Sequence, residues 1–66
     1  NCMVTINGSK LDIAGRTLLW YLSGANYGLE QIAVERNGKI IPKSQYAEAI
    51  LADGDVVEIV RFVGGG

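Results

Sequence analysis

The residues of this chain that could do chemistry are few, and the most unusual of them stand at its C-terminal end. The sequence closes on Gly64, Gly65 and Gly66, directly after a strand-like run at 55–63. Glycine has no Cβ, so such a tail is thin, adopts backbone angles closed to other residues and leaves a main-chain carboxylate unobstructed. Fully extended, the tail with Val63 reaches on the order of 10 Å, which suits threading into a partner's channel. We therefore expect 64–66 to form a flexible tail with a reactive carboxylate at Gly66, the alternative being a frayed end.

The side chains offer little else for catalysis. The chain has no histidine and one cysteine, which excludes a zinc site, a cysteine–histidine pair and an internal disulfide by counting alone. Asp53 and Asp55 flank Gly54, a spacing more typical of a tight turn than of paired carboxylates for acid–base work. Cys2 precedes Met3, a credible start, so we interpret Asn1 and Cys2 as a remnant of expression or processing. We expect no catalytic residue and no metal ligand, and hence a protein that is not an enzyme.

The composition is that of a small folded protein. Of the 66 residues, 48% are hydrophobic and 20% are charged, which provides the apolar surface that disordered segments lack. Six basic and seven acidic residues are interspersed, so no basic patch predicts nucleic-acid binding. No apolar run approaches the roughly 18 residues of a membrane span, and no signal-peptide pattern is present. We expect a single cytoplasmic domain over 1–66, with no nucleic-acid and no membrane partner.

Two hairpins are predicted by Asn-Gly pairs. Alternating apolar residues at 3–13 flank Asn7-Gly8, and the runs 32–37 and 39–41 flank Asn37-Gly38. Both pairs readily take the positive backbone angles of a two-residue hairpin turn. Pro42 then prevents the last arm from pairing much further.

One helix and a final strand complete the predicted elements. Thr17 is a suitable N-cap for a helix over about 18–25, whose apolar stripe consists of Leu18, Tyr21, Leu22 and Ala25. Ser44 is expected to cap a short turn of helix that runs through Tyr46 to Ala49. The run 55–63 is apolar on both faces, which suits a strand in the middle of a sheet. This order predicts an α+β, ubiquitin-like β-grasp fold: a mixed sheet of four to five strands, one helix packed across one face, and the first and last strands parallel at the centre.

The sequence also resembles a known family. The segments "IAVERNGKIIPKSQYAE" and "LADGDVVEIVRFVGGG", with the opening "MVTINGSKLDIAGRTL", resemble the sulfur carrier family of thiamine biosynthesis known as ThiS. The resemblance extends from Met3 to Gly66. Its Asn-Gly turns and Asp-Gly-Asp loop are individually weak signals, but their order, together with the terminal glycines, is specific.

The resemblance implies a carrier whose working group is the main-chain end at Gly66. In the family, a ThiF-like adenylating enzyme activates the terminal glycine with ATP and magnesium. Sulfur derived from cysteine, through a donor such as a cysteine desulfurase, then gives a thiocarboxylate, from which the thiazole synthase ThiG takes sulfur. ATP is expected to bind the partner, because 64–66 precede no helix and so form no phosphate-binding loop. This chain is therefore expected to bind no cofactor of its own.

Residues beside the tail are predicted to contact these partners. Phe62 and Val63 adjoin the tail, Arg61 can pair with partner carboxylates, and Ile41 with Pro42 can extend an exposed apolar patch. The alternatives are that Phe62 is a core residue and that Arg61 only solvates the sheet edge.

The helix departs from the family pattern. The family usually carries charged residues on the exposed side of this helix, whereas Leu19, Trp20 and Ser23 are uncharged here. Trp20 either packs over the edge of the sheet or belongs to a surface for self-association or for a partner. The departure leaves the carrier interpretation intact and the oligomeric state open.

Three other functions are compatible with these residues, in two classes. One is a carrier like the small subunit of molybdopterin synthase, whose tail docks into a dedicated large subunit. The other is a ubiquitin-like modifier joined to lysines, or an interaction module with an inert tail. Binding partners, isopeptide adducts and an unchanged tail, respectively, distinguish these from a thiamine sulfur carrier.

Overall fold

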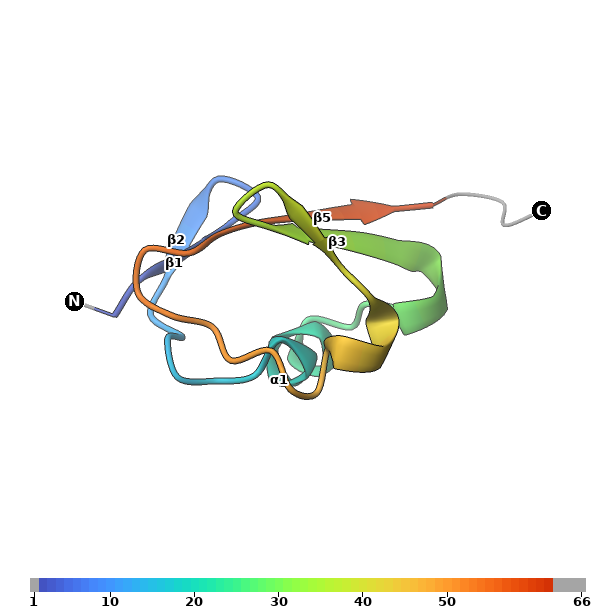
Figure 1. The fold of residues 1–66 in the computed structure, drawn as a ribbon, viewed down its shortest axis with the longest axis horizontal. Coiled ribbons are helices and arrows are strands. Elements are labelled where there is room, and N and C mark those ends of the chain that lie inside the picture. Colours follow the sequence, from blue (N-terminus) through green and yellow to red (C-terminus); the bar gives the residue numbers. More distant parts are fainter. Residues whose placement is uncertain (1, 63–66) are drawn as a thin grey trace.

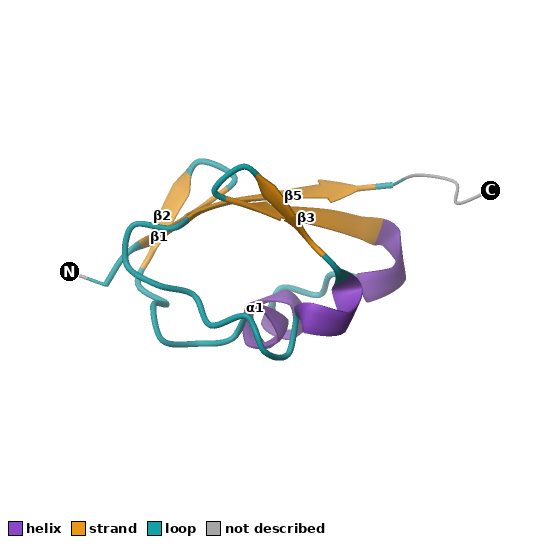
Figure 2. Ribbon diagram, viewed as in Figure 1, coloured by secondary structure: helices purple, strands orange, loops and turns teal. Residues whose placement is uncertain are grey.

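Five strands and one helix form two layers. The structure, a computed structural model, describes residues 2–62. The strands are β1 (Val4–Ile6), β2 (Ser9–Leu11), β3 (Ile32–Arg36), β4 (Lys39–Ile41) and β5 (Val56–Arg61). Helix α1 (Leu18–Gly24) lies across one face of the sheet, and two short 3₁₀ helices, η1 (Leu29–Gln31) and η2 (Lys43–Gln45), flank the β3–β4 hairpin (Figures 1 and 2). The predicted α+β architecture with one helix on one face is confirmed.

The sheet has the strand order β2-β1-β5-β3-β4. Strand β5 pairs in parallel with β1, where Thr5 lies opposite Val56, and antiparallel with β3, where Val34 lies opposite Ile59. A parallel pair needs a long crossover, and here α1 and the β3–β4 hairpin lie between the two strands in sequence. The prediction that the first and last strands run parallel at the centre of a mixed sheet is confirmed.

Both predicted hairpin turns are present with the expected geometry. Asn7 and Gly8 have φ of 49° and 85°, and Asn37 and Gly38 have φ of 52° and 85°. Two consecutive positive φ values define the type I′ turn, whose twist matches that of the flanking strands. Each turn therefore fixes the register of its hairpin.

The core lies between α1 and the inner face of the sheet. Its buried side chains are Val4, Ile6, Leu18, Leu22, Ile32, Val34, Tyr46, Leu51, Val57 and Ile59. Of the predicted apolar stripe, Leu18 and Leu22 are buried in this core and Tyr21 packs against it, whereas Ala25 lies just past the end of α1 as its C-cap. Thr17 caps the helix as predicted, because its Oγ1 accepts a hydrogen bond from the Trp20 N–H at 3.1 Å. Within residues 2–62, no helix is long and apolar enough to cross a membrane.

One local expectation is corrected by the structure. The short helix before the last strand is η2, which begins at Lys43 directly after Pro42, so Ser44 lies inside it and caps nothing. Pro42 is the N-cap of η2, with φ of −63° and an extended ψ of 148°. Proline is tolerated at a helix start because an N–H there has no partner within the helix. Strand β5 is central as predicted, but α1 covers only one of its two apolar faces.

Candidate functional site: strand β5 and the open face of the sheet

The predicted carrier terminus lies just beyond the part of the chain that the structure describes. Val63 and the three glycines Gly64, Gly65 and Gly66 fall outside it, as does Asn1. Strand β5 leads to this segment, and Phe62 is the last described residue before it. The contacts that hold β5 in place, and the residues around its C-terminal end, therefore determine how the terminus is presented.

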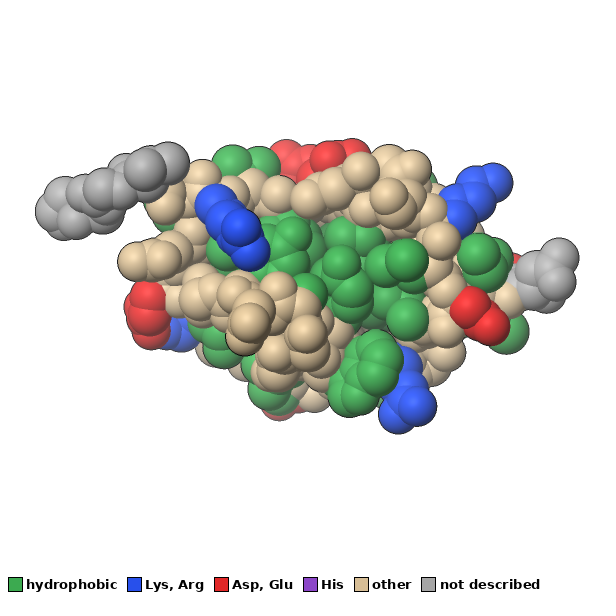
Figure 3. Space-filling model, turned by 180° about the vertical axis from the view of Figure 1, so that it is seen from behind, with side chains coloured by type: hydrophobic (Ala, Val, Ile, Leu, Met, Phe, Trp, Pro, Cys, Tyr) green, Lys and Arg blue, Asp and Glu red, His purple; other side chains and the backbone are tan. Residues whose placement is uncertain are grey.

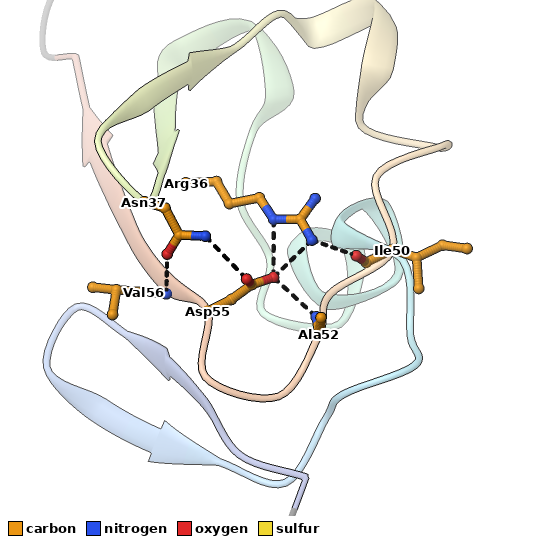
Figure 4. Close-up of polar contacts among 6 residues, drawn as sticks. All are labelled: Arg36, Asn37, Ile50, Ala52, Asp55 and Val56. Carbon is orange, nitrogen blue, oxygen red and sulfur yellow. Dashed lines mark hydrogen bonds and ion pairs between the residues drawn. The ribbon is translucent and has the colours of Figure 1, made fainter.

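A polar network anchors the beginning of β5 (Figure 4). Asp55, which is 7% exposed, accepts hydrogen bonds from Arg36 Nε at 2.9 Å, Asn37 Nδ2 at 3.0 Å and the Ala52 N–H at 2.9 Å. Arg36 Nη2 also lies 2.7 Å from the same carboxylate. Asn37 Oδ1 accepts from the Val56 N–H at 2.8 Å. The β3–β4 turn is thereby joined to the loop from which β5 starts.

The protonation of Asp55 follows from these contacts. Burial by itself would raise the pKa of Asp55, because it disfavours the charged form. Hydrogen bonds from the Ala52 N–H, the Asn37 amide and the Arg36 guanidinium, together with the charge of Arg36, outweigh burial and hold the pKa below its usual value. Asp55 is a structural anion, in agreement with the prediction that Asp53 and Asp55 serve a turn and not acid–base chemistry.

Asn7 holds the middle of β5 from the other side. Strand β1 ends at Ile6, but the Asn7 side chain continues its pairing: Oδ1 accepts from the Ile59 N–H at 2.7 Å, and Nδ2 donates to the Ile59 carbonyl at 3.2 Å. One amide side chain thus imitates the two hydrogen bonds of a strand residue. Asn7 and Asn37 each serve a turn and secure β5, whereas their sequence context predicts only the turns.

The end of β5 is fixed by two contacts. The Arg61 guanidinium lies 4.4 Å from the centre of the Tyr27 ring, a cation–π contact, and the Phe62 N–H donates to the Gln31 carbonyl at 2.7 Å. Arg61 is therefore held against an aromatic ring and does more than solvate the edge. Phe62 is 54% exposed, which excludes the alternative that it is a core residue.

The face of the sheet opposite α1 carries exposed apolar side chains next to this end. Ile40 is 64% exposed, Val56 47% and Val60 57%, and Phe62 continues the alternation of Val56 and Val60 along β5. Monomeric proteins rarely leave several large apolar side chains together without a partner. We call this surface, Ile40, Val56, Val60 and Phe62, the open sheet face.

The open sheet face also carries an acidic pair. Glu35 and Glu58 lie directly opposite one another in the β3–β5 ladder, and both are exposed. Like charges directly opposite on one face of an antiparallel pair destabilise the sheet. Such a pair amid exposed apolar residues therefore favours a docking function, and it suits a partner with basic side chains.

The structure places Ile41 and Pro42 away from Phe62. Ile41 lies opposite Val34, half-buried against the core on the helix side of the sheet, and Pro42 is exposed at the start of η2. Their neighbour Ile40, with Val56 and Val60, is what joins Phe62 on the open sheet face. Val56, Val60 and Phe62 share one face of the last strand in the sequence pattern, but that face was interpreted only as a sign of a central strand. Ile40 was missed because the face of β4 that packs on the core depends on its register with β3.

The chain is similar in sequence and in fold to proteins of thiamine biosynthesis. Residues 4–66 match the model of the ThiS family. The chain is 42% identical over 64 residues to a thiazole synthase of Paramagnetospirillum magneticum, covering 96% of this chain but only 20% of that protein. It is 57% identical over 44 residues to the sulfur carrier protein ThiS of Bacillus subtilis, covering 64% of this chain and 67% of that one. A crystal structure of the thiamine biosynthesis protein ThiS from Geobacter metallireducens superposes with a TM-score of 0.76 at 31% identity, covering 97% and 99% of the two chains.

Proposed function

This chain belongs to the ThiS family, and from that premise we propose that it is a sulfur carrier of thiamine biosynthesis and not an enzyme. The family match carries the proposal, because it extends through the glycine run to residue 66 and includes relatives named sulfur carrier protein. The β-grasp fold shared with a thiamine biosynthesis protein over nearly the whole chain supports it.

The proposed carrier group is the α-carboxylate of Gly66. A carboxylate is a poor electrophile at neutral pH, so a partner enzyme first converts it with ATP and magnesium to an acyl adenylate, releasing pyrophosphate. A persulfide derived from cysteine then displaces AMP to give an acyl disulfide. A thiol of the partner cleaves its S–S bond, which forms a disulfide on the partner and leaves a thiocarboxylate, a good sulfur nucleophile. This chain contributes the thin tail, and the partners contribute nucleotide, metal and catalytic groups.

The proposed partners act in sequence on the same terminus. A ThiF-like adenylating enzyme activates Gly66, a donor such as a cysteine desulfurase supplies sulfur, and a ThiG-like thiazole synthase receives it. About a fifth of the length of two thiazole synthases resembles this chain, which supports a thiazole synthase as partner over a large subunit of molybdopterin synthase.

The open sheet face is proposed to dock the enzyme that receives the tail. Fixing a chain segment in one conformation costs about 1–2 kcal/mol per residue, so contacts of the folded part have to compensate when a partner binds the terminal glycines. Val60 and Phe62 are the exposed apolar residues that precede the tail in sequence, and the Asn7 and Tyr27 contacts hold β5 in one position. The tail therefore starts from a fixed point next to the docking surface.

The exchange of ATP with pyrophosphate, catalysed by the adenylating enzyme, tests this proposal. We expect exchange that depends on the intact chain and none with a chain that lacks Gly66. Val60→Lys places a cation on the open sheet face and is expected to raise the concentration needed for half-maximal exchange about tenfold or more, as loss of a central apolar contact does.

Ile50→Lys is the matched control. Ile50 is 58% exposed, like Val60, but lies in the loop before β5 and away from the open sheet face. It should support exchange as well as the unchanged chain. Equal effects of the two substitutions would show that the open sheet face has no special role, and exchange without Gly66 would contradict the carrier function itself.

A further inference from the structure

A second apolar surface lies at the edge of the two layers, between α1 and the segment that leaves β2. Figure 3 shows it as a continuous apolar area on the face turned away in Figure 1. Leu11 and Ile13 form one wall, and Leu19, Trp20 and Ala25 come from α1 and its C-terminal end. We call these five residues the helix groove.

The helix groove is not simply the outside of the core. Leu11, Ile13 and Leu19 are half-buried and pack against the core, so their positions are fixed, whereas Trp20 is 47% exposed at the rim. Tryptophan buries a large apolar area when it is covered and is among the residues that contribute most to protein interfaces. A tryptophan held at the rim of an apolar groove therefore points to a docking surface.

Two arginines are held beside the helix groove by aromatic rings. The Arg16 guanidinium lies 4.6 Å from the centre of the Trp20 ring. Arg61 lies over Tyr27, whose ring is 6.5 Å from that of Tyr21, a residue that also lines the groove. Within residues 2–62, neither arginine forms an ion pair. Stacking on a ring orients a guanidinium but leaves its N–H groups free to bind carboxylates.

The charges of the two apolar surfaces are opposite. The open sheet face carries Glu35 and Glu58 at its centre, with Lys10 at its β2 edge. Arg16 and Arg61 lie beside the helix groove, with Asp12 the acidic residue among those that line it. A partner that fits the open sheet face by charge is therefore repelled from the groove, and the converse also holds. The groove fits a segment that combines apolar and acidic side chains.

A second copy of this chain fits the helix groove poorly. A symmetric contact would bring two pairs of arginines together against two aspartates, and like charges across an interface are unfavourable. A head-to-tail contact with the acidic open sheet face of another copy would be open-ended and would not close into a defined oligomer. Charge thus favours a different protein as the occupant.

We propose that the helix groove is a second docking surface, which binds an amphipathic helix of a partner protein with an apolar stripe flanked by carboxylates. Seating an apolar helix face in a hydrophobic groove is a common mode of peptide recognition. The surface lies on the opposite side of the sheet from the open sheet face, so both can be occupied at once. This inference does not depend on the sulfur-carrier function.

Trp20 is the only tryptophan of the chain and reports directly on the groove. The probe is a synthetic helical peptide with leucines at helical spacing and glutamates elsewhere, and its matched control has lysines in place of the glutamates. We expect the leucine–glutamate peptide to shift the Trp20 emission to shorter wavelength and to move the amide resonances of residues 11–25. The leucine–lysine peptide should do neither, and added salt should weaken the binding.

Charge reversal sharpens the test. Arg16→Glu with Arg61→Glu is expected to weaken binding of the leucine–glutamate peptide about tenfold or more and to allow the leucine–lysine peptide to bind, because each partner carboxylate then faces a like charge. Lys39→Glu with Lys43→Glu changes the net charge equally on the other side of the molecule and should leave binding unchanged. Circular dichroism checks that both variants are folded.

Several results would overturn the proposal. Equal binding of the two peptides to the unchanged chain would show that charge does not select the partner. Amide shifts confined to β3 and β5 would show that the peptide binds the sheet and not the helix groove. A Trp20 shift that depends on protein concentration, with a dimer in sedimentation equilibrium, would assign the groove to a second copy. A shift with phosphatidylglycerol vesicles but with neither peptide would assign it to a lipid surface.

Discussion

Asp55→Asn is the perturbation that most directly tests how β5 is held in place. Asparagine has nearly the same shape, but one carboxylate oxygen becomes an NH₂ group. Oδ1 of Asp55 accepts from the Asn37 amide, and Oδ2 accepts from Arg36 and the Ala52 N–H. Asn37 cannot turn its amide around, because its own oxygen accepts from Val56. In either orientation, the new NH₂ group therefore faces a donor.

The expected loss follows from these contacts. Hydrogen bonds to charged groups contribute about 1.5–3 kcal/mol each, and a buried donor left unpaired costs about as much again. The Arg36 side chain is 28% exposed, so water can replace part of the hydrogen bonding that it loses with Asp55. It also keeps its hydrogen bond to the Ile50 carbonyl at 2.7 Å. We expect the free energy of unfolding to fall by about 2–3 kcal/mol, out of roughly 3–10 kcal/mol for a domain of this size.

Urea unfolding at neutral pH, followed by circular dichroism, measures this change. Asp53→Asn is the control, since Asp53 accepts one exposed hydrogen bond, from the Met3 N–H at 2.9 Å, and should lose less than about 1 kcal/mol. A free energy of unfolding for Asp55→Asn within about 0.5 kcal/mol of the unchanged chain, the range of ordinary surface substitutions, would refute the reasoning.

The same residue predicts a pH dependence. The pKa of Asp55 is lower in the folded chain than its ordinary value of 3.8, so the unfolded state binds the proton more readily. Its contribution to stability is therefore complete above the unfolded-state pKa of about 3.9 and is lost as the pH falls through the lowered folded-state value. Asp55→Asn should show a flatter decline in stability below about pH 4 than the unchanged chain.

Two further substitutions test the sheet and its turns. Glu58→Gln removes the repulsion with Glu35 and should raise the free energy of unfolding by about 0.2–1 kcal/mol. The control, Glu48→Gln in an exposed turn, should leave the free energy of unfolding unchanged. An unaltered or lowered value for Glu58→Gln would argue against repulsion between the two glutamates. Gly54→Ala should destabilise the fold by about 1 kcal/mol or more, because Gly54 has φ of 89°. Gly24→Ala in α1 should stabilise the fold by about 0.5–1 kcal/mol. The midpoint temperature of thermal unfolding should therefore fall for the first variant and rise for the second.

Local sequence signals were sufficient to predict most of the fold. Each Asn-Gly pair specifies a two-residue turn through positive φ at both positions, and the apolar stripe of α1 follows directly from helical spacing. The two-sided apolar pattern of β5 correctly placed it at the centre of the sheet. These features depend on neighbours within a few residues, which is why the sequence alone reveals them.

The candidate site depended on contacts between distant segments. The Asn7 amide reaches Ile59, 52 residues away, and Asp55 meets Arg36 across 19 residues. Whether Ile40 or Ile41 faces solvent is decided by register, since a shift of one residue exchanges the two faces of a strand. Periodicity within a single segment contains no information on such pairings, so sequence reasoning named Ile41 and missed Ile40.

The central claim is that sulfur is carried by the main-chain end at Gly66, and intact mass spectrometry tests it most directly. The chain is incubated with ATP, magnesium, its adenylating enzyme and a cysteine-derived sulfur donor, and the product is then fragmented. We predict that one oxygen is exchanged for sulfur at Gly66 and that Cys2→Ser leaves this exchange unchanged. Sulfur found instead on the Cys2 side chain, or a mass that does not change, would contradict the account.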